Sequence, residues 1–285
     1  MKALVTGARG QLGSALVASA PPDCEVVGLD RASLDLADPA AIRAAVERER
    51  PDVVMNAAAW TAVDKAEAEE DAARAVNADA VGVLAEAART VGADLVHVST
   101  DFVFDGTRGR PYRPDDEPDP LGAYGRTKLA GERAAGPDAL IVRTAWVYAP
   151  AGANFVHTML RLMREQGEVR VVADQVGTPT YAPGLAAALW RLHAAGARGP
   201  LHYTDSGAAS WYDFAVAIQE EALAAGLLPR AVPVVPIATA DFPTPAARPS
   251  YSLLDKSRTW ELLGGPAPHW RANLRTMIKE LASHG

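Results

Sequence analysis

The chain contains one cysteine, Cys24, among its 285 residues, and this scarcity excludes an intramolecular disulfide framework. The paired Cys and His spacings of a structural metal site are missing too, so we expect no bound metal. No apolar run is long enough to span a bilayer, and no signal peptide precedes the first apolar segment. We therefore expect a soluble cytoplasmic protein.

An excess of basic residues is also absent. The chain has 28 Lys and Arg against 35 Asp and Glu, giving a formal net charge of -7. This balance argues against nucleic acid as the main partner and provides no basic stripe for a membrane surface. Hydrophobic residues make up 49% of the chain, which is enough for a substantial core.

Strand-like and helix-like segments alternate through the first half of the chain. We expect strands near residues 2–6, 25–29, 52–56, 94–99 and 139–144. We expect helices near residues 11–20, 39–50, 71–91 and 122–135. The alternation predicts an α/β fold, a Rossmann-type doubly wound parallel sheet with helices on both faces.

The second half of the chain does not continue the regular alternation of strands and helices. We expect helices near residues 154–165, 211–227 and 269–283, with short strands near 169–172 and 201–204. A proline-rich span, residues 233–249, excludes a long helix and favours an extended segment. We expect residues 1–147 to form a dinucleotide-binding domain, to which later segments return. Residues 148–285 are then mainly a smaller C-terminal substrate-binding lobe.

A glycine-rich turn follows the first expected strand and precedes an Ala- and Leu-rich helix. This order places backbone N–H groups around a pyrophosphate at a helix N-terminus. Gly7 would make the tight turn, Gly10 would let the diphosphate approach, and Gly13 would let the helix pack on the strand. The second strand leads to Asp30, about 20 residues on, where a ribose-binding carboxylate belongs.

The choice between the two nicotinamide cofactors depends on neighbouring residues of opposite charge. Asp30 would accept hydrogen bonds from the ribose hydroxyls of NADH and would repel a 2′-phosphate. Arg31 would attract the 2′-phosphate of NADPH. The sequence leaves both cofactors open.

Tyr124 and Lys128 lie four residues apart on an expected helix, so their side chains share one face. An ammonium beside a phenol is expected to lower the pKa of the phenol toward neutrality and make it a proton donor. Thr100 and Asp101 follow a buried strand at its carboxyl end, where open parallel sheets bind ligands. Alone, these patterns also fit a solvated helix face and a strand-ending turn. Together with the glycine turn, they indicate a nicotinamide-dependent oxidoreductase.

The motifs resemble the extended branch of the short-chain dehydrogenase/reductase superfamily, which acts on nucleotide sugars. Longer matches narrow the resemblance to the dTDP-4-dehydrorhamnose reductase family and cover nearly the whole chain: Asn56–Glu67, Ser99–Gly106, Tyr124–Glu132, Arg143–Tyr148, Gln175–Thr180 and Pro243–Pro249. The resemblance implies reduction of the 4-keto group of a dTDP-6-deoxy-hexulose to dTDP-L-rhamnose by NADPH or NADH. It also implies a monomer or homodimer, and Ser14 and Ala15 stand where some relatives carry a magnesium-binding glutamate.

The glycine turn and the resemblance together imply roles for individual residues. The expected cofactor contacts are Gly7, Gly10, Gln11, Leu12, Gly13, Asp30, Arg31, Asp35, Leu36, Ala58, Ala59, Thr61, Tyr124 and Lys128. The expected catalytic residues are Thr100, Tyr124 and Lys128. The expected sugar-nucleotide contacts are Thr100, Asp101, Trp146, Asn154 and Arg248. Arg248 would meet the diphosphate or form a surface salt bridge, and His97 is expected in the core rather than as a ligand.

Other functions fit part of the pattern. A nucleotide-sugar dehydratase usually carries Thr-Asp-Glu after the strand, whereas this chain has Phe102 in place of the glutamate. Another nucleotide-sugar reductase or an epimerase would share the fold. A noncatalytic module, such as the regulatory subunit of methionine adenosyltransferase, also keeps this fold and binds a cofactor. Retention of Thr100, Tyr124 and Lys128 favours catalysis.

Overall fold

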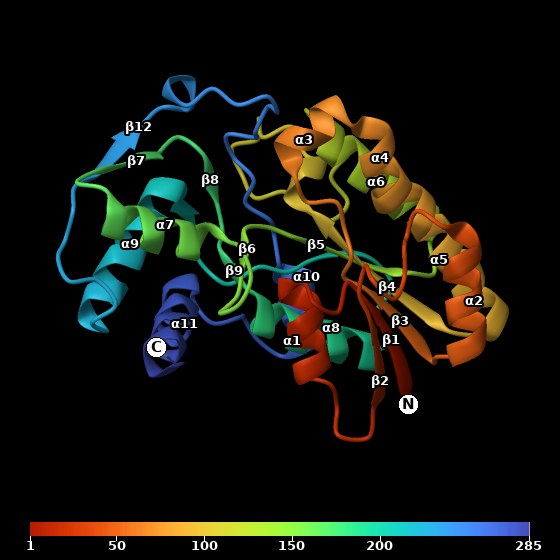
Figure 1. Cartoon of the computed structure of the whole chain (residues 1–285). Helices are drawn as coiled ribbons and strands as arrows, with labels where there is room; N and C mark the ends of the chain where they lie inside the picture. Colours follow the sequence, from red (N-terminus) through yellow and green to blue (C-terminus); the bar gives the residue numbers. More distant parts are fainter. Residues whose placement is uncertain (285) are drawn as a thin grey trace.

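A six-stranded parallel sheet forms the centre of the computed structural model, which describes residues 1–284 (Figure 1). The strand order is β10-β5-β4-β3-β1-β2, as in a doubly wound fold. The strands are β1 (Lys2–Thr6), β2 (Glu25–Leu29), β3 (Val53–Asn56), β4 (Asp94–Thr100), β5 (Leu140–Thr144) and β10 (Gly199–His202). The predicted α/β fold and its five N-terminal strands are confirmed.

Helices cover both faces of this sheet, because each parallel strand needs a crossover to reach the next. One face packs against α1 (Gln11–Ala18), α8 (Ala182–Ala194) and α10 (Ser257–Leu263). The other face packs against α2 (Pro39–Glu49), α5 (Ala80–Val91) and α6 (Ala123–Ala135). Both faces of the sheet are therefore covered, and ligands can reach it only at its edges.

The expected helix over residues 71–91 is divided into three pieces. It consists of α4 (Glu70–Arg74), the π-helix η1 (Ala75–Asp79) and α5, and it follows the short α3 (Val63–Ala68). The π-turn was not predicted, because apolar spacing does not distinguish it from an α-helix. Such turns often occur at functional sites.

The helix α8 was not predicted either. Its N-terminal segment contains Pro183 and Gly184, which look like breakers, but a proline is well tolerated in the first turn. After α8 the chain adds β10 to the sheet beside β5. Residues beyond 147 thus contribute to the sheet, while the predicted boundary between domain and lobe stays a prediction.

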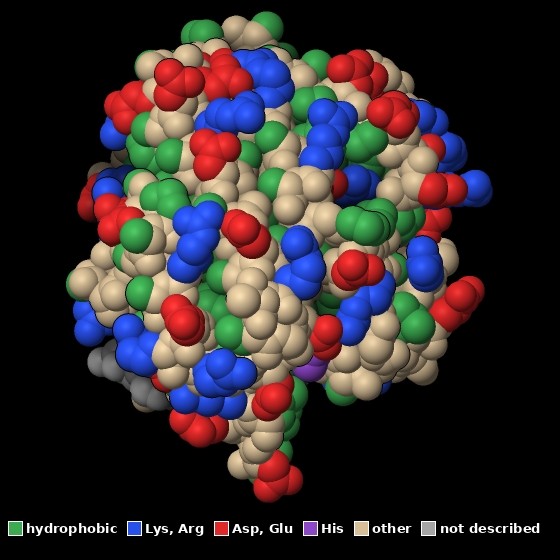
Figure 2. Space-filling view, turned by 90° about the vertical axis from the view of Figure 1, so that its right-hand side faces the viewer, with side chains coloured by type: hydrophobic (Ala, Val, Ile, Leu, Met, Phe, Trp, Pro, Cys, Tyr) green, Lys and Arg blue, Asp and Glu red, His purple; other side chains and the backbone are tan. Residues whose placement is uncertain are grey.

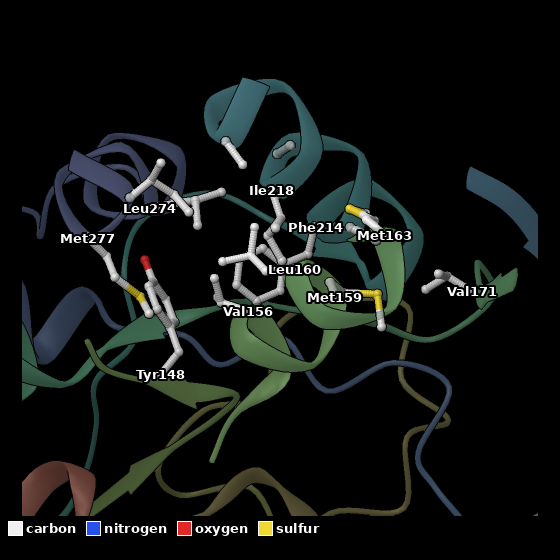
Figure 3. Packing of buried hydrophobic residues seen from close by; sticks show 14 of the residues in the cluster. Tyr148, Val156, Met159, Leu160, Met163, Val171, Phe214, Ile218, Leu274 and Met277 are labelled. Carbon is white, nitrogen blue, oxygen red and sulfur yellow. The ribbon is translucent and has the colours of Figure 1, made fainter. Parts of the chain in front are cut away.

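The C-terminal lobe packs three helices, α7 (Phe155–Glu165), α9 (Trp211–Ala224) and α11 (Trp270–His284) (Figure 1). Three short strand pairs connect it: β7 (Val169–Val172) with β12 (Val234–Ile237), β8 (Val176–Gly177) with β11 (Ala209–Ser210), and β6 (Val147–Tyr148) with β9 (Thr180–Tyr181). Figure 3 shows side chains from α7, α9 and α11 converging on one apolar core. Two 3-10 turns, η2 (Asp101–Val103) and η3 (Thr239–Asp241), complete the secondary structure.

Charged side chains of both signs alternate over the face of the molecule drawn in Figure 2. No basic stripe stands out on that face, in agreement with the negative net charge. Among residues 1–284, none of the helices has the length and apolar character needed to cross a membrane.

Candidate active site

The glycine turn lies between β1 and α1 at the carboxyl edge of the sheet. Gly7 has a φ of +67°, and a Cβ at this position would lie 2.9 Å from the backbone N of Ala58. A Cβ on Gly13 would lie 2.0 Å from the carbonyl oxygen of Gly7. The turn therefore tolerates no side chain at either glycine, and it presents bare backbone at the sheet edge.

The N-terminus of α1 is open to an anion. Gly10 is its N-cap and provides no side-chain hydrogen bond, and the first turn has no acidic residue. The first N–H groups of a helix lack partners within the helix and favour negative charge. Bare backbone at the turn and an uncapped helix end are the features that a pyrophosphate requires. These residues thus fit the expected dinucleotide.

Asp30 follows β2 and forms an ion pair with Arg9. Its Oδ1 accepts hydrogen bonds from the backbone N and the hydroxyl of Ser33, and these bonds hold the pKa of Asp30 below its usual range. Arg9 lies 3.0 Å from its Oδ2 and is largely exposed, and Arg31 is also exposed. Sequence reasoning missed Arg9, which adds a second guanidinium where a 2′-phosphate would lie.

The loop after β3 contains three other expected cofactor residues, Ala58, Ala59 and Thr61, and it is anchored by the π-helix. Asn77 accepts a hydrogen bond from the N of Trp60 and donates to its carbonyl oxygen. The same amide donates to the hydroxyl of Thr127 on α6. One buried side chain thus ties the loop to the helix that carries Tyr124 and Lys128.

Two expected adenine contacts, Asp35 and Leu36, lie after β2. Leu36 is buried in the core beneath α2, and Asp35 is exposed and accepts a hydrogen bond from the backbone N of Ala37. Their roles stay predictions.

Lys128 is buried, with 2% of its surface exposed, although it lies on the same face of α6 as Tyr124. Its Nζ donates to the carbonyl oxygen of Val98 at 2.6 Å and lies 3.4 Å from Nε2 of His97. Burial lowers the pKa of Lys128 to about 8, and the charge of Glu132 offsets part of this change. The ammonium therefore points toward the strand β4, and its first partners belong to that strand.

The expectation for the pKa of Tyr124 is wrong for the chain without cofactor. Burial raises this pKa to about 12, a hydrogen bond with Thr100 opposes the increase, and the charge of Asp101 adds to it. The ammonium of Lys128 is directed to β4 and exerts no resolved effect on the phenol. The phenol is fully protonated at neutral pH, which is the form that donates a proton.

Asp101 is a buried carboxylate beside the phenol of Tyr124. Its Oδ1 accepts a hydrogen bond from Thr100 at 3.1 Å, whereas its Oδ2 has no partner within 3.5 Å among the described residues, although the hydroxyl of Ser252 lies close enough to lower the pKa of the carboxyl. Burial raises the pKa of Asp101 to about 6. An unpaired buried oxygen is costly, and a sugar hydroxyl would provide the missing donor.

Trp146 adopts a φ of +49°, which is rare for a residue with a large side chain. Its ring stacks on Trp211 with 3.6 Å between ring centroids, and Gly177 leaves room for it. The two rings line a pocket of about 80 Å³ together with Phe102, Gln175, Arg248, Pro249 and Ser252. Strained backbone of this kind occurs often at active sites and ligand-binding sites. Sequence reasoning missed the place of Trp211 in this pocket.

Arg248 lines the same pocket, but its guanidinium pairs with Asp64 of α3 at 2.8 Å. This ion pair connects the proline-rich segment of the lobe to the sheet domain. Asn154 lies elsewhere, as the N-cap of α7, and donates to Oε1 of Gln11 at 3.0 Å. The structure thus brings Asn154 to the glycine turn and leaves its role toward the sugar a prediction.

No group of three His, Cys, Asp or Glu side chains suited to a metal occurs within residues 1–284. Ser14 donates its hydroxyl to the carbonyl oxygen of Ala8, and Ala15 packs beside the sheet core.

Comparison with known proteins agrees with this geometry. A family model described as RmlD substrate binding domain matches residues 1–283. A dTDP-4-dehydrorhamnose reductase from Burkholderia thailandensis is 46% identical, and the match covers 99% of this chain and 100% of that protein. A crystal structure of such a reductase from Clostridium acetobutylicum has 42% identity and a TM-score of 0.93, with 99% of each chain covered.

A solved reductase of the same name from Bacillus anthracis, in complex with NADP, has 36% identity and a TM-score of 0.92. It covers 98% of this chain and 99% of its own. The chain therefore belongs to the dTDP-4-dehydrorhamnose reductase family.

Proposed function

We propose that the chain reduces the 4-keto group of dTDP-4-dehydro-L-rhamnose to give dTDP-L-rhamnose, with NADPH or NADH as reductant and Tyr124 as proton donor. One observation carries this proposal. Tyr124, Thr100 and Asp101 meet at the carboxyl edge of β4, beside a turn suited to a dinucleotide. The names of the relatives, and the NADP in one of their structures, support the substrate and the cofactor.

The cofactor, when bound, supplies the hydride that reaches the ketone carbon. Negative charge then grows on the ketone oxygen, and Tyr124 donates its phenolic proton to that oxygen. Thr100 lies beside the phenol, and its hydroxyl would help to orient the ketone oxygen. Lys128 follows Tyr124 by one helical turn, and its positive charge would favour the phenolate that remains, although its ammonium is hydrogen-bonded to β4 rather than to the phenol.

Asp101 and the tryptophan pair act on binding. Oδ2 of Asp101 has no close partner among the described residues and would accept a hydrogen bond from a sugar hydroxyl beside Ser252. Trp146 and Trp211 line a pocket of about 80 Å³, where their rings would pack against the sugar. We also propose that the protein is cytoplasmic, because its cysteine, Cys24, is free, which suits a reducing compartment. We propose that it is a monomer or homodimer.

The test supplies a freshly generated dTDP-4-keto sugar and follows the loss of absorbance from NADPH and NADH in separate reactions. Tyr124→Phe should lower kcat by about 10²-fold or more, because a positioned acid contributes on that scale. Tyr212→Phe, on the lobe helix α9, is the matched control and should keep the activity of the wild type. A Tyr124→Phe rate within threefold of the wild type would remove Tyr124 from its role. Consumption of neither cofactor, with tight binding of a second protein, would favour a regulatory subunit.

A further inference from the structure

Three polar side chains form a row across the sheet beneath the site. Thr6 of β1 pairs in register with Asn56 of β3, and Asn56 pairs in register with His97 of β4. Side chains alternate between the two faces of a strand, so register partners point to the same face. This face is the one covered by α5 and α6. The row therefore lies between the sheet and α6, and the side chain of Lys128 extends from α6 toward it.

Continuous hydrogen bonds join the row to the ammonium. The hydroxyl of Thr6 lies 2.6 Å from Oδ1 of Asn56, and Nδ2 of Asn56 lies 3.0 Å from Nδ1 of His97. Nε2 of His97 then lies 3.4 Å from Nζ of Lys128. At most 2% of the surface of each of these side chains is exposed, so no water competes for the contacts. Polar groups buried in this way require one another as partners.

Only one arrangement of protons suits a charged Lys128. An ammonium has three donors and no acceptor, so Nε2 of His97 must accept and the ring proton must be on Nδ1. This tautomer requires the Asn56 amide to be turned over from the orientation that the structure shows, in which Nδ2 faces His97 and Oδ1 accepts from Thr6. Nδ1–H then donates to the amide oxygen of Asn56, and the amide nitrogen donates to Thr6. If the proton were on Nε2, it would face the ammonium, and that arrangement suits only a neutral Lys128 amine. The orientation of the Asn56 amide and the tautomer of His97 are therefore coupled to the charge of Lys128.

We infer that His97 is a positioning residue: its neutral imidazole, oriented by Asn56 and Thr6, accepts a hydrogen bond from Lys128 and keeps that ammonium charged and in place. This inference rests on the proposed function, because it concerns the lysine that stabilises the phenolate of Tyr124. Among the described residues, Nζ donates hydrogen bonds only to the carbonyl oxygen of Val98 and to His97. Loss of the imidazole acceptor would leave the ammonium with a single neutral partner.

The groups around Lys128 support a neutral His97. Burial, with the charge of Lys128, keeps the pKa of His97 well below its ordinary value, so the ring does not become an imidazolium. The other titratable or charged groups near Lys128 come from α6, β5 and the end of β4: Tyr124, Glu132, Arg143 and Asp101. Glu132 is held by Arg143 at 2.7 Å and gives Lys128 no hydrogen bond. His97 is thus the only side chain of the described residues that accepts from Nζ.

Nitrogen NMR of the cofactor-free chain tests the tautomer without any catalysis. In a long-range ¹H–¹⁵N spectrum of histidine-labelled protein, the signals missing from His97→Asn identify the ring. At pH 7 we expect the proton on Nδ1 and an unprotonated Nε2. Lys128→Met removes the donor opposite Nε2, so the preference for the Nδ1–H tautomer should weaken. An Nε2–H ring or an imidazolium in the wild type would overturn the inference.

Two matched substitutions distinguish the roles of the two ring nitrogens of His97. His97→Gln can place an amide oxygen near the Nε2 position and keep an acceptor for Lys128. His97→Asn keeps an amide only near the Nδ1 position, beside Asn56, and removes that acceptor. A hydrogen bond to the charged form raises a pKa, so its loss lowers the pKa of Lys128. The alkaline limb of the kcat profile for ketone reduction should move by about one pH unit to lower pH in His97→Asn and stay in place in His97→Gln.

The outcomes distinguish this inference from the proposed function. An unmoved alkaline limb in a folded His97→Asn, or equal shifts in both variants, would mean that the ring only fills space. In that case both variants would lose thermal stability without a change in the shape of the profile. If the wild type reduces no ketone, the proposed function fails, and the tautomer of His97 still decides whether the ring accepts from Lys128.

Discussion

The sheet domain and the C-terminal lobe bury different kinds of side chain. The sheet carries a buried polar row, which ends at Lys128, and a buried carboxylate, Asp101. The core of the lobe consists of apolar and aromatic residues from α7, α9 and α11, methionines among them (Figure 3). Hydrogen-bonded networks fix one geometry, whereas methionine-rich packing adapts its shape. The candidate catalytic residues therefore lie in the hydrogen-bonded part of the molecule, and the pocket lined by Trp146 and Trp211 lies beside the methionine-containing core of the lobe.

The largest effect is expected from breaking the lobe core at Phe214. This side chain is fully buried among the rings of Tyr148, Phe155 and Trp270. Phe214→Ala should lower the free energy of unfolding by about 3–5 kcal/mol, because it removes the ring and leaves a cavity. Urea unfolding followed by far-UV circular dichroism and by tryptophan fluorescence measures the change.

Phe242 provides the control, because 58% of its surface is exposed. Phe242→Ala should change the free energy of unfolding by less than about 0.5 kcal/mol. If the two probes of Phe214→Ala disagree, the lobe unfolds before the sheet. If Phe214→Ala has the same stability as the wild type, the lobe core does not hold the lobe together.

The next largest effect is expected at the glycine turn of the sheet domain. Gly13→Ala would place a methyl 2.0 Å from the carbonyl oxygen of Gly7, so the turn or α1 must shift. Overpacking of this kind costs about 1–3 kcal/mol, and we expect binding of NADPH to weaken by about tenfold or more. Quenching or enhancement of NADPH fluorescence measures the dissociation constant. Gly167→Ala is the matched control, since no atom lies within 4 Å of its Cβ, and unchanged binding in both variants would contradict a close-packed turn.

The same contrast explains how much of the molecule the sequence predicts. Strands β1 to β5 were predicted because each is a short apolar run bounded by turn residues, and the pattern is local. The Tyr124–Lys128 face was predicted because it depends only on helical spacing. The register that lines up Thr6, Asn56 and His97 depends on contacts between distant strands, so sequence reasoning placed His97 only in the core. One signal was available, because each of the three is a polar residue near the carboxyl end of an apolar strand.

The direction of the pKa change at Tyr124 was wrong for a related reason. Spacing on a helix shows that two side chains share a face, but it does not show where a long side chain ends. Lys128 reaches the carbonyl oxygen of Val98, so burial rather than its charge dominates the phenol. The place of Trp211 against Trp146 likewise depends on how α9 docks, which no local pattern contains.

A third prediction concerns the junction between sheet and lobe, where Asp205 is fully buried. Burial raises the pKa of Asp205 to about 7, and hydrogen bonds from Asn273 and the backbone N of Tyr181, with the charge of Lys256, offset only part of this change. Between about pH 4 and pH 7 the folded chain keeps a proton that the unfolded chain has lost, so stability falls as pH rises. The slope of this contribution is at most about 1.4 kcal/mol per pH unit.

Asp205→Asn removes this titration, and its stability relative to the wild type should increase from pH 5 to pH 7 in urea unfolding experiments. Asp23→Asn, at an exposed position, should keep the pH dependence of the wild type. A constant difference between Asp205→Asn and the wild type across this range would mean that the carboxyl is ionised in the folded chain.

The smallest effect is expected from Asp64→Asn, which acts on the contact between the two regions. Asp64 holds the guanidinium of Arg248 at 2.8 Å, and both side chains are partly exposed, so the ion pair contributes less than about 1 kcal/mol to stability. The substitution keeps an amide near Arg248 but removes the charge that competes with a substrate diphosphate. If Arg248 binds that diphosphate, KM for the nucleotide sugar should fall about threefold while kcat stays the same, because the guanidinium no longer leaves a charged partner on binding. Arg248→Gln should raise KM in the same assay. An unchanged KM in both variants would instead show that the Asp64–Arg248 ion pair only connects the lobe to the sheet domain. In that case Arg248 does not bind the substrate diphosphate.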